Sequence, residues 1–200
     1  MRGTAGVQRD LDGVDARAWV LAYDGVFESP GVLREDDVLA GRVGFYDAYP
    51  GSGGGRSTRV LAGTTLLRAG PALQWEATAW GGWRQLSLQQ DFTGYYADPE
   101  RGDGSLQHHQ ATSGGARASL DWEPGHALTL RAGVDWRLDA FHQDRQAVLV
   151  DGTPWRTEDK VRAIQGSGGG FVGASLHPRP DLRIEPSLRA QALWIAPDDG

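Results

Sequence analysis

Residues 128–139 alternate apolar and polar side chains without interruption. The apolar positions are Leu128, Leu130, Ala132, Val134, Trp136 and Leu138, and the positions between them are Thr129, Arg131, Gly133, Asp135, Arg137 and Asp139. A period of two predicts a β-strand with one apolar face and one polar face. On a helix, Arg131 and Asp135 would share a stripe with Leu128, so no helical face would be purely apolar.

The length of this stretch restricts the fold further. Ordinary strands have about 5–6 residues, whereas about 9–11 residues of a tilted strand cross a bilayer. Two interpretations remain open. The stretch is either a long strand of a soluble sheet, or a membrane strand with lipid on its apolar face and an aqueous lumen on its polar face.

Composition favours the second interpretation. The chain of 200 residues has 29 Gly and 8 Trp, and glycine-rich, tryptophan-rich, strand-patterned sequences are typical of bacterial membrane barrels. It has no Cys, which excludes disulfides, cysteine zinc sites and thiol catalysis. The net charge of −6, with acidic and basic residues mixed, gives no reason to expect a nucleic-acid partner.

Targeting and spanning signals are missing from the sequence. No run of 18 apolar residues predicts a transmembrane helix. Residues 1–8 lack the basic and apolar regions of a signal peptide. Strand-like sequence extends over almost the whole chain, so we expect residues 1–200 to be one partial barrel domain, with no plug domain and no signal peptide of its own.

Other strands are predicted along the rest of the chain. Residues 1–15 read as the end of a strand and a turn, and further strands are expected at 16–27, 57–67, 73–86, 116–122, 161–176 and 182–194. A second GSGGG sequence at 166–170 is expected to weaken its strand. The connections alternate between long loops, at 28–56, 89–113 and 141–159, and short turns, at 68–72, 123–126 and 177–181. This pattern predicts an all-β meander of about seven long antiparallel strands in an open curved sheet, with its long loops at one end.

Tryptophans are spaced as in a membrane barrel. Trp75 and Trp122 lie near short turns, and Trp83, Trp136 and Trp194 lie at the far ends of their predicted strands. Eight residues separate Trp75 from Trp83, or about 26 Å of strand, which tilt reduces to roughly 20 Å. An apolar band of about 25 Å is edged by aromatic girdles in such barrels. We therefore interpret these five residues as membrane-interface anchors, with core packing as the alternative.

The polar strand positions form a second set of candidates. They are Arg117, Asp121, Arg131, Asp135, Arg137, Asp139, Arg183, Glu185 and Arg189. In a barrel they would line a wet lumen and contact a plug, and the alternative is an ordinary solvated sheet face.

The predicted loops hold the remaining candidates. Phe92, Tyr95 and Tyr96 could capture a substrate, with packing within the loop as the alternative. The adjacent pair at 108–109 is the one pair of neighbouring histidines, and we interpret it as polar loop residues rather than metal ligands. The acidic stretch 98–103 misses calcium-loop spacing, so we read it as a solvated loop. No catalytic constellation stands out, which predicts a non-enzymatic protein without a cofactor or metal.

Five segments of the chain are informative together. They are RVGFYDAY (42–49), ATAWGGWRQLSL (77–88), DFTGYYADPERGDGSLQ (91–107), LTLRAGVDWRLDAF (128–141) and GGFVGASLHPRPDLRIEPSLRAQAL (169–193). These segments resemble the barrel region of TonB-dependent receptors, the active transporters of the outer membrane of Gram-negative bacteria.

The resemblance implies a 22-stranded barrel in the outer membrane, a plug domain, and a TonB-type periplasmic protein that supplies energy. The substrate of such a receptor would be a scarce nutrient, such as a metal chelate, cobalamin or a glycan. Two alternatives remain: a passive porin-like or structural barrel, and a soluble β-sandwich that binds carbohydrate through its tryptophans.

Overall fold

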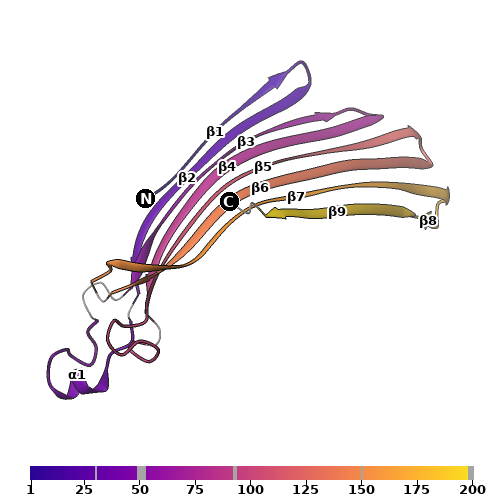
Figure 1. Ribbon diagram of the computed structural model, residues 1–200. Helices are drawn as coiled ribbons and strands as arrows, with labels where there is room; N and C mark the ends of the chain where they lie inside the picture. Colours follow the sequence, from indigo (N-terminus) through magenta and orange to yellow (C-terminus); the bar gives the residue numbers. More distant parts are fainter. Residues whose placement is uncertain (30, 49–52, 92–93, 150, 198–200) are drawn as a thin grey trace.

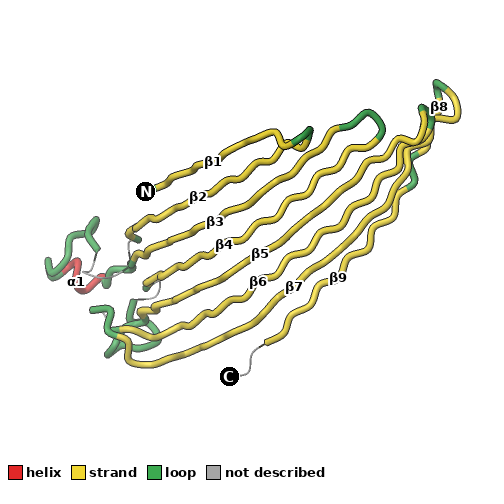
Figure 2. The backbone as a smooth tube through the Cα atoms, turned by 90° about the horizontal axis from the view of Figure 1, so that it is seen from above, coloured by secondary structure: helices red, strands yellow, loops and turns green. Residues whose placement is uncertain are grey.

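The computed structural model describes residues 1–29, 31–48, 53–91, 94–149 and 151–197. They form one antiparallel sheet, in which successive strands lie side by side, and a short helix α1 (Glu35–Leu39) in the connection after β2 (Figures 1 and 2). The strands are β1 (Arg2–Leu11), β2 (Val14–Glu28), β3 (Gly54–Ala69), β4 (Leu73–Gln90), β5 (Gly104–Gly125), β6 (Leu128–Val148), β7 (Pro154–Arg179), β8 (Leu182–Ile184) and β9 (Ser187–Pro197).

The expected all-β meander is confirmed. Each strand from β1 to β7 pairs with its neighbours in the chain, and β8 and β9 both pair with β7, so eight strand positions are filled. One more position is filled than the seven expected, because residues 2–11 form the complete strand β1. Within the described residues the sheet does not close: β1 pairs with β2 alone and β9 with β7 alone.

The two ends of the sheet differ as expected, with one correction. Residues 29–53 and 91–103 form long connections at the end where α1 lies, and the tight turns lie at the opposite end (Figure 2). The prediction of a third long loop at 141–159 is wrong. The strand β6 continues to Val148 and β7 begins at Pro154, so only 149–153 separate the two strands. The strand β5 likewise begins at Gly104, inside the second expected loop.

The glycine run at 166–170 lies inside β7, which pairs with β6 and β9 through the whole run. A Cβ atom built on Gly166 would lie within 2.5 Å of atoms of the Trp194 indole on β9. The missing side chain at this position is thus what lets a large ring lie flat against the next strand.

On the opposite face, three more aromatic rings cover glycines on neighbouring strands. Trp19 lies over Gly63, Trp80 over Gly115, and Phe171 over Gly133, where an added Cβ would approach the ring to within 2.7, 3.0 and 2.3 Å respectively. A ring over a glycine shields the exposed backbone and fixes the register of the two strands. Trp80, which breaks the alternation of its strand, owes its position to this arrangement.

We expect Gly133→Ala to lower the free energy of unfolding by about 1–3 kcal/mol, because the new methyl group would push the Phe171 ring off the strand. The control is Gly168→Ala on the adjacent strand, where the added carbon would meet its nearest atom at 3.7 Å. That change should be neutral or stabilise by up to about 1 kcal/mol. Urea unfolding of both variants in detergent micelles measures the difference, and equal stabilities would contradict the packing described.

Candidate functional site: the two faces of the sheet

The strand register aligns alternate positions into rows that cross the sheet. One row consists of Ala16, Leu66, Ala77, Ala118, Val134, Gly170 and Ala190, each paired with the next. Three more rows follow toward the long connections. The second row consists of Ala18, Thr64, Ala79, Ala116, Trp136, Gly168 and Ala192, and the third of Val20, Ala62, Gly81, Gly114, Leu138, Gly166 and Trp194. The fourth row consists of Ala22, Val60, Trp83, Thr112, Ala140, Ile164 and Ala196. We call these four rows and their extension on β4–β7 toward the short turns the apolar face. From β2 to β9 none of the four rows carries a charged side chain; on β1 the first row continues to Arg9.

A polar row ends the apolar face toward the long connections. It consists of Asp24, Thr58, Gln85, Gln110, His142 and Arg162, each paired with the next across six strands. We call it the border row. Beyond it on the same face lie Arg56, Ser87, His108, Asp144 and Lys160. The row at which the apolar face ends is therefore polar in all six strands, although on β2 the apolar Val26 follows beyond it.

The height of the apolar face matches a bilayer. From Leu130 to Ala140 on β6 there are ten residue steps, or about 33 Å at about 3.3 Å each. A strand tilt of about 40° reduces this to about 25 Å, the height of the apolar band of outer-membrane barrels.

The five predicted anchor tryptophans all lie on the apolar face. Trp75 and Trp122 lie near short turns, as expected. Trp83 lies next to the border row rather than at the end of its strand, because β4 continues to Gln90. Trp194 lies near the end of β9. Trp136 is misplaced in the prediction: because β6 continues to Val148, this residue lies near the middle of its strand.

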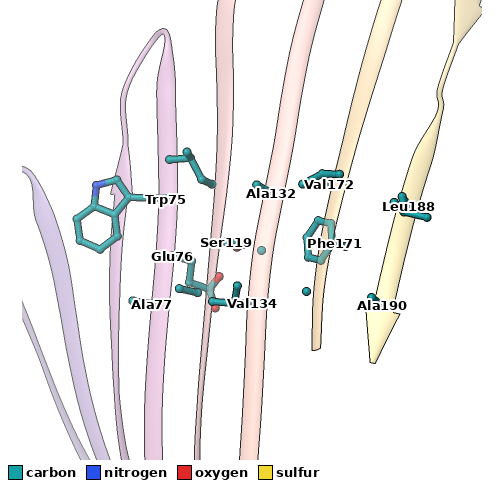
Figure 3. A pocket seen from close by; sticks show the side chains of 14 residues that line it. Trp75, Glu76, Ala77, Ser119, Ala132, Val134, Phe171, Val172, Leu188 and Ala190 are labelled. Atoms are coloured by element: carbon teal, nitrogen blue, oxygen red, sulfur yellow. The ribbon is translucent and has the colours of Figure 1, made fainter. Parts of the chain in front are cut away.

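The apolar face contains an open hollow of about 550 Å³ near the short turns. Figure 3 shows Trp75 at one side of it and Leu188 and Ala190 at the other, with side chains such as Ala132 and Val134 between them. The lining includes residues of β4, β5, β6, β7 and β9, so the hollow is a property of the sheet rather than of one hairpin.

The opposite face, which we call the polar face, carries all nine residues predicted to line a lumen, and each of them is ion-paired. The pairs are Arg117 with Glu76 (2.9 Å), Asp121 with Arg131 (3.7 Å), Asp135 with Arg189 (2.9 Å), Arg137 with Asp139 (2.6 Å), and Arg183 with Glu185. Exposed pairs of this kind contribute about 0–1 kcal/mol each, so their main effect is to hold the charges in place.

One ion pair joins two strands that are not neighbours in the sheet. Asp135 on β6 and Arg189 on β9 meet over β7, where Gly169 is the register partner of Asp135. A glycine at that position leaves the space above β7 open to the two long side chains. Ser113 adds a further contact by donating its hydroxyl hydrogen to Asp139 at 2.5 Å.

The predicted loop candidates are not brought together into one site. Phe92 lies outside the described residues. The ring of Tyr95 is covered by the guanidinium of Arg34, 4.9 Å from its centroid, whereas the side chain of Tyr96 is 88 % exposed.

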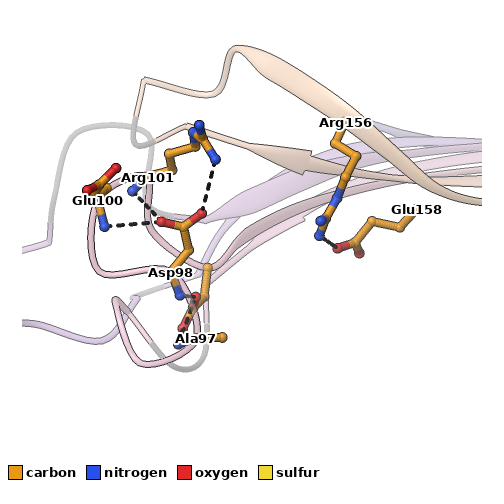
Figure 4. A network of polar contacts seen from close by, with 7 residues as sticks. Ala97, Asp98, Glu100, Arg101, Arg156 and Glu158 are labelled. Atoms are coloured by element: carbon orange, nitrogen blue, oxygen red, sulfur yellow. Dashed lines mark hydrogen bonds and ion pairs between the residues drawn. The ribbon is translucent and has the colours of Figure 1, made fainter.

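Carboxylates of the acidic loop 98–103 accept hydrogen bonds from backbone N–H groups of the same loop region (Figure 4). The Asp98 carboxylate accepts the backbone N–H groups of Glu100 (3.1 Å) and Arg101 (2.9 Å), and Asp103 accepts those of Ala97 and Asp98. These bonds give the acidic residues a structural role in the loop.

The histidine pair is also not a metal site. His108 and His109 lie in β5 rather than in a loop, and consecutive strand residues point to opposite faces. His109 stacks on Phe141 with 6.3 Å between ring centroids. Within the described part of the chain, no group of three or more His, Asp or Glu residues is arranged to hold a metal ion.

At the turn between β6 and β7, the Thr153 backbone N–H donates to the Asp151 carboxylate at 2.9 Å. This bond is the main cause of the lowered pKa of Asp151.

Sequence reasoning did not single out Arg59 and Arg84, which are direct register partners on the polar face. Each is one arginine in a separate predicted strand, and only the register shows that they meet.

No protein-family model and no curated protein matches the chain. Among the residues that the structure describes, no helix has the length and apolarity needed to cross a membrane.

Proposed function

We propose that this chain forms part of the wall of an outer-membrane β-barrel of the TonB-dependent receptor type, with its apolar face against lipid and its polar face toward the lumen. One observation carries the proposal: from β2 to β9, four consecutive rows without a charged side chain end at a polar border row shared by six strands.

The apolar face needs a partner that shields it from water. The described residues form one sheet, with no second sheet packed on it. Large side chains on the apolar face are consequently exposed, such as Val134 at 62 % and Leu188 at 72 %. An apolar surface this extensive is unfavourable in water and suits hydrocarbon. The single sheet also counts against the soluble sandwich, which needs two sheets and a shared dry core.

The polar face suits the other side of such a wall. Its ion pairs neutralise one another while leaving each charge in contact with water or with a plug domain. The resemblance supplies the rest of the proposal: the intact receptor imports a metal chelate, cobalamin or a glycan, and a periplasmic TonB-type partner provides the energy. Trp75, Trp122 and Trp83 anchor the wall at the lipid–water interfaces.

Cysteine labelling tests which face meets lipid, because the chain has no cysteine of its own. Ala118 lies on the apolar face and its neighbour Ser119 on the polar face. We expect a polarity-sensitive fluorophore attached through Ala118→Cys to be quenched by brominated lipid in vesicles, and one attached through Ser119→Cys to be quenched far less. Equal quenching at the two sites would contradict the proposal.

The coding sequence on either side of this region separates an active receptor from a passive porin. A reading frame that joins this chain to a plug domain supports the receptor. A complete barrel without a plug would overturn the assignment to a receptor, whereas the proposal that the chain forms part of a membrane-barrel wall would stand.

A further inference from the structure

Arg59 and Arg84 form a pair of like charges at the centre of the polar face. They are direct register partners on β3 and β4, and their row continues to Tyr23 on β2 and Ala111 on β5. Directly opposed like charges destabilise a sheet. The two opposed guanidinium groups are therefore unfavourable unless a negatively charged group lies between them.

In the part of the chain that the structure describes, the nearest negative group is Asp139, which is ion-paired with Arg137 and acts on Arg84 only at longer range. No carboxylate there lies within ion-pair distance of either Arg59 or Arg84. The nearby Arg137, in contrast, is held by Asp139 at 2.6 Å. Two arginines without a close ion-pair partner among the described residues are therefore register partners in a chain whose net charge is −6.

A hollow of about 380 Å³ opens beside this pair. Its lining includes Trp19, Arg59, Trp80, Arg84 and Arg137. Its volume lies within the range of about 300–1,000 Å³ found for small-molecule sites.

The two indole rings give the hollow flat apolar walls. Each ring lies over a glycine of the next strand, as described above, and is therefore held against the sheet. The guanidinium of Arg137 lies 5.6 Å from the centroid of the Trp80 ring, so cationic and aromatic groups meet at one edge of the hollow.

We propose that this hollow binds a small organic anion with a flat ring and two or more carboxylate groups. Guanidinium groups bind carboxylates through paired N–H donors, and aromatic rings stack on indoles. The inference deepens the proposed function, on which it rests for the lumenal setting, by giving the chemical class of the substrate.

Titration of the folded chain in detergent micelles tests the inference, with tryptophan fluorescence as the signal. The probe is benzene-1,3,5-tricarboxylate, and the uncharged comparison is benzene-1,3,5-tricarboxamide. We expect the tricarboxylate to bind and the tricarboxamide not to bind. The double variant Arg59→Gln/Arg84→Gln should bind the probe about ten- to a hundredfold more weakly, since it loses at least one charge-assisted pair.

The matched control is Arg68→Gln, the same charge change on the same strand but on the other face. It should change the affinity by no more than about twofold. Arg84→Lys keeps the charge and loses the planar fork, so it should bind more weakly than the wild type and more tightly than the double variant. Circular dichroism shows that each variant retains its strands.

Three results with the variants and a competing ligand would overturn the inference. These are unchanged binding by the double variant, an equal loss in Arg68→Gln, or a hexaglutamate peptide binding more than about tenfold more tightly than the probe, which would assign the arginines to a protein contact. The titration reports on the polar face alone, whereas the cysteine labels report on contact with lipid. A chain that is quenched by lipid but binds no probe contradicts this inference only, and the reverse result contradicts the proposed function only.

Discussion

Val134→Arg should destabilise the chain in a bilayer by about 2–4 kcal/mol, the cost of an arginine on the lipid face near the membrane centre. Val134 is 62 % exposed in the middle of the apolar face, in a row of alanines, a leucine and a glycine. The only neighbours available to a guanidinium there are hydrocarbon and small apolar side chains, so the charge would lose its hydration without gaining a partner.

The control is the adjacent residue at the same depth on the same strand. Asp135→Asn breaks the ion pair with Arg189, in which the side chains of the two partners are 38 % and 53 % exposed. An exposed pair of this kind contributes about 0–1 kcal/mol, so the second variant should fold nearly as well as the wild type. Urea titration of both variants folded into lipid vesicles gives the two free energies. If Asp135→Asn were the more damaging change, the assignment of the faces would be reversed.

Without detergent, we expect the purified chain to aggregate. The outer edges of β1 and β9 have no partner strand in the described structure, and unpaired edges are templates for pairing with another chain. The apolar face adds a large exposed hydrophobic surface between these edges. Both features act in the same direction, so loss of monomer in plain buffer should be nearly complete.

Size-exclusion chromatography and light scattering measure this result, with the same preparation in detergent micelles as its control. Detergent covers the apolar face and should restore a dispersed, strand-rich protein. A monodisperse monomer with a cooperative thermal transition in plain buffer would instead favour a soluble protein and contradict the membrane wall.

Alternation predicted the strands well wherever one face is apolar. The segments 73–86, 128–139 and 182–194 are all strands, apart from a break at Glu185 and Pro186 between β8 and β9. Proline has no N–H group to donate to a ladder, which accounts for the break. Its carbonyl still accepts the Ala174 N–H at 3.0 Å, so the chain stays beside β7.

The same signal failed where both faces are polar. Residues after Phe141 show no alternation of apolar side chains. The strands β6 and β7 nevertheless stay paired, as at His142 and Arg162, with register shifts after Arg145 and Ala147. Hydrogen bonding does not depend on side-chain polarity, so a hydrophobic pattern cannot locate the end of such a strand. This failure also explains why Trp136 was placed at a strand end.

Only part of the candidate site could be predicted from the sequence, because alternation assigns residues to a face but does not give the strand register. The nine polar-face residues follow from alternation alone, but their ion pairs depend on register. Arg59 and Arg84 meet because the turn between β3 and β4 fixes which residues face each other. Nothing in the sequence of either strand separately contains that information.

The continuation of β5, β6 and β7 past the border row has a consequence for how the cell surface would be recognised. Six residues of β5 precede Gln110, and six residues of β6 follow His142. At about 3.3 Å per residue and the tilt of about 40° used above, these strands would rise about 15 Å above the edge of the apolar face. In the proposed orientation, an antibody approaching from outside would meet a rigid ledge of paired strands. Its epitope would combine residues distant in sequence, so binding should be lost when the protein is denatured.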